Sequence, residues 1–450
     1  MRWHVMAASL VAALWMAGSV TRLPPAAAPV ADARIYAALA MGLAEHGVLG
    51  QYVDPAKAPL ASLEVTPLYP LFLAGLIKLD PALRQTLSCA LTSVLPEHCP
   101  RSYTTVVVAQ AALLVTAVVL CWFLGYSWSG RYSVAWATFA AALLSGIHAG
   151  YVAAMLTEAL ALPLVAAFTL MWCALVRNPR PPVVVAVSVS LALLVLTRPS
   201  FWYLLWFMPM LAAGFAPSRN LRRLCAPIMA TFALALLLTS SWLVRNYLVS
   251  GHATVSGGGY GGRVLVQRVS YNDMTLREFG AAFIFWLPEF GDSLARAILP
   301  RDSYARLGWG DDSLYAIGWT RMRAKLGSTA QPRPGALWAI IHQDVLARPI
   351  AHLKSTIALT WRGMFIGKMW GLVGWLCAAA ILWRTLRRGH AAYALAVVPA
   401  AFMLILHAAV SVNIPRYNFM LLPPLALAVG LVAAQLITRG RKRAPDVAHY

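Results

Sequence analysis

The chain has 450 residues, of which 60% are hydrophobic and 12% are charged, and its formal net charge is +21. Soluble domains are about 45–50% apolar and about 25% charged, so this chain has too little polar surface for a soluble fold. The same proportions exclude a disordered chain. They leave an all-α polytopic membrane protein, in which the distribution of the positive charge matters more than its sum.

Apolar stretches of about 20 residues, the length that crosses a bilayer, recur along the chain. Two long segments separate them, 21–103 after the first span and 244–368 after the seventh. We expect these to be two large outer loops of a single integral-membrane domain, 1–450, and the second loop to be a partly helical cover that helps to select a substrate. We predict about ten spans, at 3–20, 104–126, 134–150, 153–176, 182–197, 199–216, 224–243, 369–384, 391–411 and 418–437.

The basic residues follow the predicted topology. Segments predicted to be inner carry fourteen Lys and Arg residues against one acid, Asp446, whereas the short outer connections hold only Arg198 and Arg416. This asymmetry is the positive-inside rule, from which long translocated loops are exempt. We therefore predict a membrane protein with both termini in the cytoplasm. Most of the positive charge serves to orient the chain in the membrane, so it does not indicate a nucleic-acid partner.

The N-terminal stretch allows two interpretations. Arg2, an apolar run and the small residues up to Ala31 fit a secretory signal. The length of the run, through Val20, favours a retained helix. In both interpretations the residues that follow are on the outer side.

Two of the six cysteines, Cys89 and Cys99, lie ten residues apart in the first outer loop. In an oxidising compartment they are candidates for a disulfide, with two free thiols as the alternative. The other four lie in predicted spans, where Cys is usually a small core residue. No Cys/His pattern has metal-binding spacing.

The first outer loop begins with a helix signal. Ile35, Leu39 and Leu43 recur at helical spacing and Gly47 is a stop, which predicts an amphipathic helix at the membrane surface with Asp32 as its N-cap. A cap alone would be worth ~1 kcal/mol. The alternative is a functional carboxylate.

Two further features lie at the outer side. In the run 66–74, two prolines flank Tyr69, which predicts a turn into a second apolar helix with Pro70 at its first position. Glu158 is placed in a span, where a carboxylate costs ~2.5–3.5 kcal/mol on insertion scales. It should therefore face a polar cavity or pair with an outer arginine.

Three arginines, Arg198, Arg245 and Arg416, each stand where a span meets the outer side. The planar guanidinium can donate two bonds at once to a phosphate. Together with two carboxylates, they indicate an anionic ligand such as a lipid-linked phosphosugar. Its tail needs a membrane groove, and a carboxylate would deprotonate the acceptor hydroxyl.

These motifs, in this order, resemble the GT-C glycosyltransferases, above all the bacterial relatives of the protein O-mannosyltransferases and the aminoarabinose transferase of lipid A. The likeness covers roughly 1–250 and 390–437, and the order and sidedness of short motifs carry it. The motifs are Asp32 with Tyr36, the run 66–74, Leu156-Thr157-Glu158, Leu196-Thr197-Arg198-Pro199, Trp242-Leu243-Val244-Arg245-Asn246-Tyr247 and Pro415-Arg416-Tyr417.

The resemblance implies a polyprenyl-phosphate sugar donor, an outer active site, usually inversion at the anomeric carbon, and an acceptor that is a lipid, a glycan or a protein. It implies Asp32 as the base. Asp32-Ala33 stands where many relatives have Asp-Glu, which argues against the protein mannosyltransferases proper. Some members use a divalent metal, for which this chain has no clear site. Candidate substrate contacts are Tyr36, Tyr69, Glu158, Arg198, Arg245, Arg416 and Tyr417.

Two other functions compete with this one. A transporter or flippase would have polar span interiors and usually paired repeats, but apart from Glu158 the predicted spans hold no acid. A polysaccharide polymerase or ligase would use a diphosphate-linked donor. The pair Asp311-Asp312 in the second outer loop is typical of a solvated turn.

Overall fold

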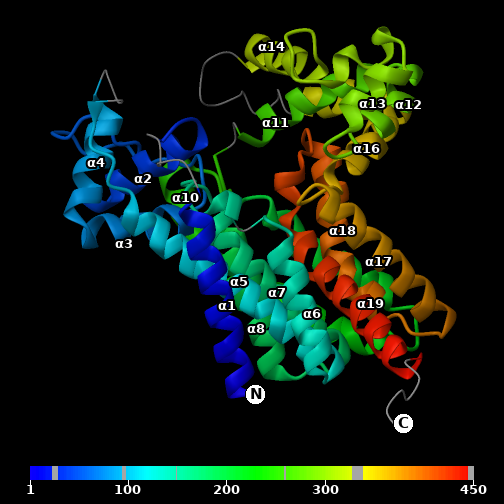
Figure 1. Cartoon of the computed structure of the whole chain (residues 1–450). Coiled ribbons are helices and arrows are strands. Elements are labelled where there is room, and N and C mark those ends of the chain that lie inside the picture. Colours follow the sequence, from blue (N-terminus) through cyan, green and yellow to red (C-terminus); the bar gives the residue numbers. More distant parts are fainter. Residues whose placement is uncertain (23–28, 94–97, 148, 258–259, 327–337, 444–450) are drawn as a thin grey trace. The chain divides into compact units, whose positions relative to one another are not determined.

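The computed structural model describes residues 1–22, 29–93, 98–147, 149–257, 260–326 and 338–443 (Figure 1). Asp446 and the alanines just before Pro29 lie outside these ranges. Every regular element in the described ranges is a helix, which confirms the all-α class. The chain divides into two compact units. The first comprises Met1–Val255, Ile381–Ala396 and Ala426–Tyr450, and the second comprises Ser256–Ala380 and Val397–Leu425. A single domain over 1–450 stays a prediction.

A helix corresponds to each of the ten predicted spans. Seven of them are long and apolar enough to cross a membrane: α1, α5, α7, α10 with the turn before it, α17, α18, and α19 with the turn before it. The other three, α6, α8 and α9, are apolar but shorter. The ten helices are α1 (Arg2–Val20), α5 (Thr104–Ser129), α6 (Tyr132–Leu144), α7 (Glu158–Arg177), α8 (Pro181–Thr197), α9 (Phe201–Phe215), α10 (Cys225–Ser250), α17 (Met369–Arg387), α18 (Ala392–Val410) and α19 (Leu422–Arg443), the last preceded by a 3₁₀ turn, η8 (Pro415–Leu421).

Small residues set the packing of the first unit. On α1, only Ala8, Ala12 and Met16 are buried, at i, i+4 and i+8, and this helix packs against α5. In α5, a Cβ at Gly125 would lie 2.7 Å from Oγ1 of Thr138 in α6. Close approach of backbones through small side chains is the usual way in which membrane helices associate.

Three shorter helices follow α1 in the first outer loop: α2 (Asp32–His46), α3 (Leu68–Leu79) and α4 (Pro81–Thr92). α2 packs against both others and ends at Gly47, whose φ of 68° is the left-handed conformation that a helix stop uses. Two predicted helix starts are wrong. Ala31, with φ 48°, is the N-cap of α2, so Asp32 is its first residue. Pro67 is the N-cap of α3, so Pro70 is its third residue.

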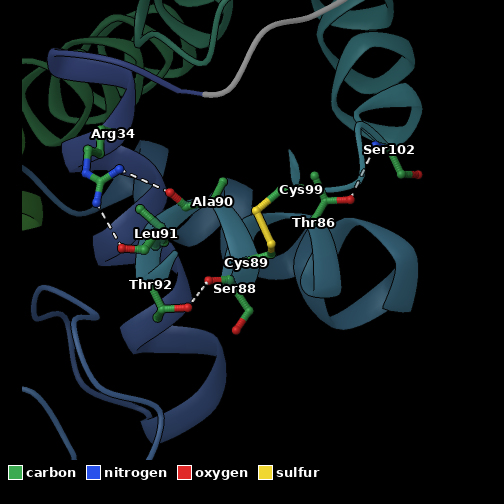
Figure 2. The surroundings of a disulfide bond; sticks show 9 residues. All are labelled: Arg34, Thr86, Ser88, Cys89, Ala90, Leu91, Thr92, Cys99 and Ser102. Atoms are coloured by element: carbon green, nitrogen blue, oxygen red, sulfur yellow. Dashed lines mark hydrogen bonds between the residues drawn. A yellow bond between two sulfur atoms is a disulfide. The ribbon is translucent and has the colours of Figure 1, made fainter. Parts of the chain in front are cut away.

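The structure joins Cys89 of α4 to Cys99, with Cα atoms 5.7 Å apart (Figure 2). Beside this disulfide, the Arg34 guanidinium reaches the C-terminal end of α4. Its Nη1 donates to the Ala90 carbonyl at 3.1 Å and its Nη2 to the Leu91 carbonyl at 2.9 Å. The start of α2 is therefore tied to the disulfide-bearing helix.

The second unit contains α11 (Tyr260–Val269), α12 (Leu276–Phe285), α13 (Gly291–Ile298), α14 (Leu314–Leu326) and α16 (Pro349–Gly363). α12 packs against α13 and α16, and α11 packs against α14. A buried arginine, Arg268, joins α11 to α16 within this unit. It donates to the Ala408 and His352 carbonyls, to Asn272 Oδ1 and to Thr356 Oγ1 at 2.7–3.2 Å.

Candidate functional site

Charged groups from three helices meet around the phenol of Tyr36, one turn into α2. Burial raises the pKa of Tyr36 to about 12; Arg198 lowers it, Glu158 and Asp32 raise it, and a side-chain hydrogen bond with Thr157 lowers it. These groups come from the start of α2, the start of α7 and the end of α8. The first unit therefore brings four of the predicted site residues together.

Glu158 and Arg198 form a nearly buried ion pair. Nη1 of Arg198 lies 3.1 Å from Oε1 of Glu158, and the two side chains are 17% and 4% exposed. The Thr157 hydroxyl lies 3.4 Å from Oε2 of the same carboxylate. The pairing expected for a carboxylate at membrane depth is present, and it lies beside Tyr36 rather than apart from it.

Tyr69 packs against Tyr36 and connects this cluster to α5. Its ring lies edge-on to the Tyr36 ring with centroids 5.2 Å apart, and its hydroxyl donates to Oε1 of Gln110 at 2.8 Å. Nε2 of Gln110 then donates to the Val152 and Ala154 carbonyls at 2.9 and 3.0 Å. These bonds satisfy the irregular backbone that leads into α7, which lipid could not do.

Gln110 is a residue that sequence reasoning missed. The sequence contains a signal for it, because Gln110 is the one amide side chain in the apolar α5 and a buried amide needs hydrogen-bond partners. Tyr69 is fully buried and bonded to Gln110, so within the structure it positions Tyr36 and the start of α7.

Arg245 lies on α10 and contacts the first outer loop. Its Nη1 donates to the Ser62 carbonyl at 2.9 Å and to Oδ1 of Asn246 at 2.8 Å, and its Cζ is 4.8 Å from the centroid of the Trp242 ring. It thereby ties α10 to the segment between α2 and α3.

Trp242 also forms part of the wall of a cavity of about 340 Å³. Apart from Ser241, the lining is apolar, and it comes from α2, α3, α8, α10 and the segment between α2 and α3. The lining residues are Leu43, Leu49, Pro67, Leu71, Leu196, Ser241 and Trp242. Leu196 stands two residues before Arg198, so the cavity wall and the ion pair share the end of α8.

Arg416 and Tyr417 belong to the second unit. Cζ of Arg416 lies 5.5 Å from the centroid of the Tyr417 ring, and this ring lies 6.0 Å from that of His407. These two residues stay candidates through the resemblance alone.

Metal-ligating side chains do not gather in the described part of the chain. Within it, no group of three or more His, Cys, Asp or Glu residues could hold a metal ion. Asp311 and Asp312 are exposed residues in the turn before α14. No step proposed below uses a metal.

The fold and the site define a polytopic, all-helical membrane protein with a carboxylate, phenol and guanidinium cluster near an apolar cavity. No protein-family model matches the chain, and no curated protein matches it. Among solved structures, the crystal structure of ArnT from Cupriavidus metallidurans bound to undecaprenyl phosphate is similar to it. The match has 15% sequence identity and a TM-score of 0.36, and covers 95% of this chain and 77% of that chain. We therefore base the function on this chain's own residues.

Proposed function

We propose that the chain is a membrane glycosyltransferase. It moves a sugar from a polyprenyl-phosphate donor to a lipid, glycan or protein acceptor at the outer face of the bacterial cytoplasmic membrane. The observation that carries this proposal is the meeting of Asp32, Glu158 and Arg198 at Tyr36, with Leu196 of the apolar cavity on the same helix end as Arg198.

In the proposed reaction, Asp32 is the general base. The acceptor hydroxyl gives its proton to the Asp32 carboxylate while its oxygen attacks the anomeric carbon. The bond from that carbon to the phosphate oxygen breaks, and its electron pair leaves with polyprenyl phosphate. Attack from the opposite face inverts the anomeric carbon. As the first residue of α2, Asp32 lies at the helix end where the dipole favours a negative charge.

The leaving phosphate needs cations and hydrogen-bond donors. Arg198 supplies a guanidinium next to Tyr36, and the Tyr36 hydroxyl keeps its proton because its pKa is about 12. Arg245 uses Nη1 for Ser62 and Asn246. Its other nitrogens make no hydrogen bond within the described residues, which suits a phosphate.

The polyprenyl tail requires an apolar site. The cavity of about 340 Å³ between α2, α3, α8 and α10 has the apolar lining that such a chain needs. The donor contains no nucleotide, so the all-helical fold needs no nucleotide-binding sheet.

The test is donor cleavage by the full chain in lipid nanodiscs. Undecaprenyl phosphate carrying radiolabelled glucose, mannose or aminoarabinose is supplied together with an envelope extract as acceptor. We expect one donor to yield undecaprenyl phosphate and a labelled acceptor. Asp32→Asn should lower kcat by roughly 10²–10⁴-fold, the usual contribution of a general base, with little change in donor binding.

Asp54→Asn is the matched control, because Asp54 lies in the same outer loop and its contacts are local, an ion pair with Lys57 at 3.7 Å and a hydrogen bond from the Ala56 backbone N–H at 2.9 Å. Full activity of a correctly folded Asp32→Asn chain would exclude Asp32 as the base. A diphosphate product would instead identify a polymerase or ligase, and movement of the donor across the bilayer without cleavage would identify a flippase.

A further inference from the structure

A buried arginine of the second unit lies between two tryptophan rings. Arg362, in the last turn of α16, is 6% exposed. Its Cζ lies 4.5 Å from the centroid of the Trp309 ring and 5.1 Å from that of Trp286. Trp286 is held in place by a hydrogen bond from its Nε1 to the Leu307 carbonyl at 3.2 Å.

Like the buried Arg268 of this unit, Arg362 has no acidic partner in the described part of the chain. Its Nη1 donates to the Tyr271 hydroxyl at 3.3 Å, and within the described ranges no carboxylate pairs with it. By contrast, Arg306 pairs with Glu278, and Arg321 and Arg348 share Asp273.

A cation this deeply placed is costly without an anion. No nitrogen of Arg362 is among the fully enclosed polar atoms that lack a partner. Nε and Nη2 donate no hydrogen bond within the described residues, and neither atom is fully enclosed. A carboxylate or phosphate would fit the planar fork of the guanidinium.

Aromatic surface continues outward from Arg362. Trp309 is 58% exposed, and its ring centroid lies 4.7 Å from that of Tyr315 in an edge-on arrangement. The apolar C–H face of a sugar ring packs on such a ring, and the hydroxyls at its edge remain free for hydrogen bonds. Asp311 and Asp312, exposed beside Trp309, accept hydrogen bonds from hydroxyls and repel polyanions.

We infer that Arg362, Trp309 and Tyr315 form a binding subsite for a saccharide that carries one acidic group. Its carboxylate or phosphate lies on Arg362, and its sugar ring stacks on Trp309. If the chain transfers sugars as proposed above, this subsite receives the acceptor. In this respect the inference rests on the proposed function, whereas binding itself does not require the transfer.

The test is saturation-transfer NMR and competition on the full chain in nanodiscs without donor. The ligands are methyl glucuronide, methyl glucoside 6-phosphate, methyl glucoside and inorganic phosphate. We expect the two acidic sugars to bind at least tenfold more tightly than the neutral sugar or phosphate alone. Trp309→Ala should weaken that binding by about threefold to tenfold. Arg362→Lys, which keeps the charge but loses the fork, should weaken it by about tenfold.

The matched control is Trp383→Ala. Trp383 is 60% exposed and its ring also lies under an arginine, with Cζ of Arg387 at 4.0 Å, so it should bind the sugars as the wild type does. Trp309 is a surface residue, so its variant keeps the test decisive if Arg362→Lys fails to fold. Equal binding of neutral and acidic sugars, or unchanged binding by Trp309→Ala, would overturn the subsite.

A glucuronosyl lipid in the nanodisc distinguishes the source of the saccharide. If it displaces methyl glucuronide, the subsite takes lipid-linked head groups as well; if it does not, the subsite takes free saccharide. Displacement by phosphatidylglycerol would overturn the saccharide assignment. Asp32→Asn should bind these ligands normally, so a failure of the transfer reaction is distinguishable from a failure of the subsite.

Discussion

At Tyr36, burial and the surrounding charges act on one phenol in opposite directions. Burial, Glu158 and Asp32 favour the neutral form, whereas Arg198 and Thr157 favour the ionised form, and the pKa is raised to about 12. The neutral form therefore predominates over the whole physiological range. In the proposed reaction Tyr36 is a hydrogen-bond donor and not a base.

Replacing this donor tests that role. We expect Tyr36→Phe to lower the rate of transfer by roughly 10- to 150-fold, because one donated hydrogen bond to a charged group is worth about 1.5–3 kcal/mol. Since the raised pKa keeps the phenol protonated throughout the physiological range, the loss should be equal at pH 6 and pH 9, measured as kcat at both values. Tyr52→Phe, another buried tyrosine of this unit, is the control. A loss confined to alkaline pH would contradict the raised pKa.

The buried ion pair permits a stability test at the same scale. Glu158→Gln removes the charge of the carboxylate that Arg198 contacts in a nearly buried position, and breaking a buried ion pair typically costs about 3–5 kcal/mol. Asp302→Asn breaks a pair with Arg277 whose side chains are 66% and 81% exposed, and exposed pairs are worth about 1 kcal/mol or less. We expect a clear drop in thermal midpoint in detergent only for Glu158→Gln. Equal midpoints would mean that water screens the Glu158–Arg198 pair.

Single residues of the site could be predicted where their chemistry conflicts with their surroundings. A carboxylate in a predicted span is costly, so Glu158 was expected to face a polar cavity or to pair with an outer arginine, whereas Arg198 was expected to contact an anionic ligand. That these two side chains pair with each other depends on the packing of α7 against α8, which local sequence does not encode. Gln110 shows the same limit, because its hydrogen bonds reach more than forty residues along the chain.

At the scale of elements, helix ends were predictable where backbone chemistry decides them. Gly47 ends α2 because glycine adopts a positive φ without strain. The predicted span 134–150 instead ends at Leu144, although the residues that follow are partly apolar. The tertiary bonds from Gln110 hold part of that irregular backbone, and such bonds leave no periodic signal in the sequence.

The end of α16 depends on a glycine in the second unit. A Cβ at Gly363 would lie against the amide of Asn413 and 2.6 Å from Nδ2 of Asn418. Asn418 Nδ2 donates to the Gly363 carbonyl at 3.1 Å and to Oδ1 of Asn413 at 2.7 Å. Both amides are buried, so displaced partners would be left without hydrogen bonds.

We therefore expect Gly363→Ala to destabilise the chain by at least about 2 kcal/mol, the cost of unsatisfied buried polar groups. Gly280→Ala in α12 is the control, because a Cβ there meets no atom within 4 Å. It should stabilise the chain by about 0.4–1 kcal/mol. The thermal midpoints of both variants in detergent decide the matter. A neutral Gly363→Ala would mean that the asparagine network can shift aside.

At the scale of the whole molecule, the outward-facing apolar side chains fit lipid as the solvent. α1 exposes Leu10 and Leu14 by 61% and 64%, and α10 exposes Leu237 by 67%. Scattered over a soluble protein, such residues would need no comment. Along helices whose other faces are also apolar, they are the surface expected of membrane spans.

The number of crossings is a property of the whole chain. Seven helices are long and apolar enough to span, and three are shorter, at 13, 17 and 15 residues. Helices of these lengths measure about 20–26 Å at 1.5 Å per residue, less than the hydrocarbon core of about 30 Å. Buried irregular segments extend such helices where protein surrounds them.

We predict that all ten helices cross, because this count keeps the arginines around residues 177–180 and 219–223 on the inner side, whereas seven crossings would place them outside. With seven crossings, the ends of α7, α9 and α17 would face outward and the end of α10 would face inward. Single cysteines at Asn178, Ser218, His390 and His252, in a chain without its four free thiols, distinguish these cases through a membrane-impermeant maleimide. We expect labelling from outside at position 252 alone. Ser129→Cys should stay unlabelled and Asp54→Cys should be labelled under either count, so these two are the controls. Outside labelling at 178, 218 and 390 with none at 252 would mean that the three shorter helices do not cross.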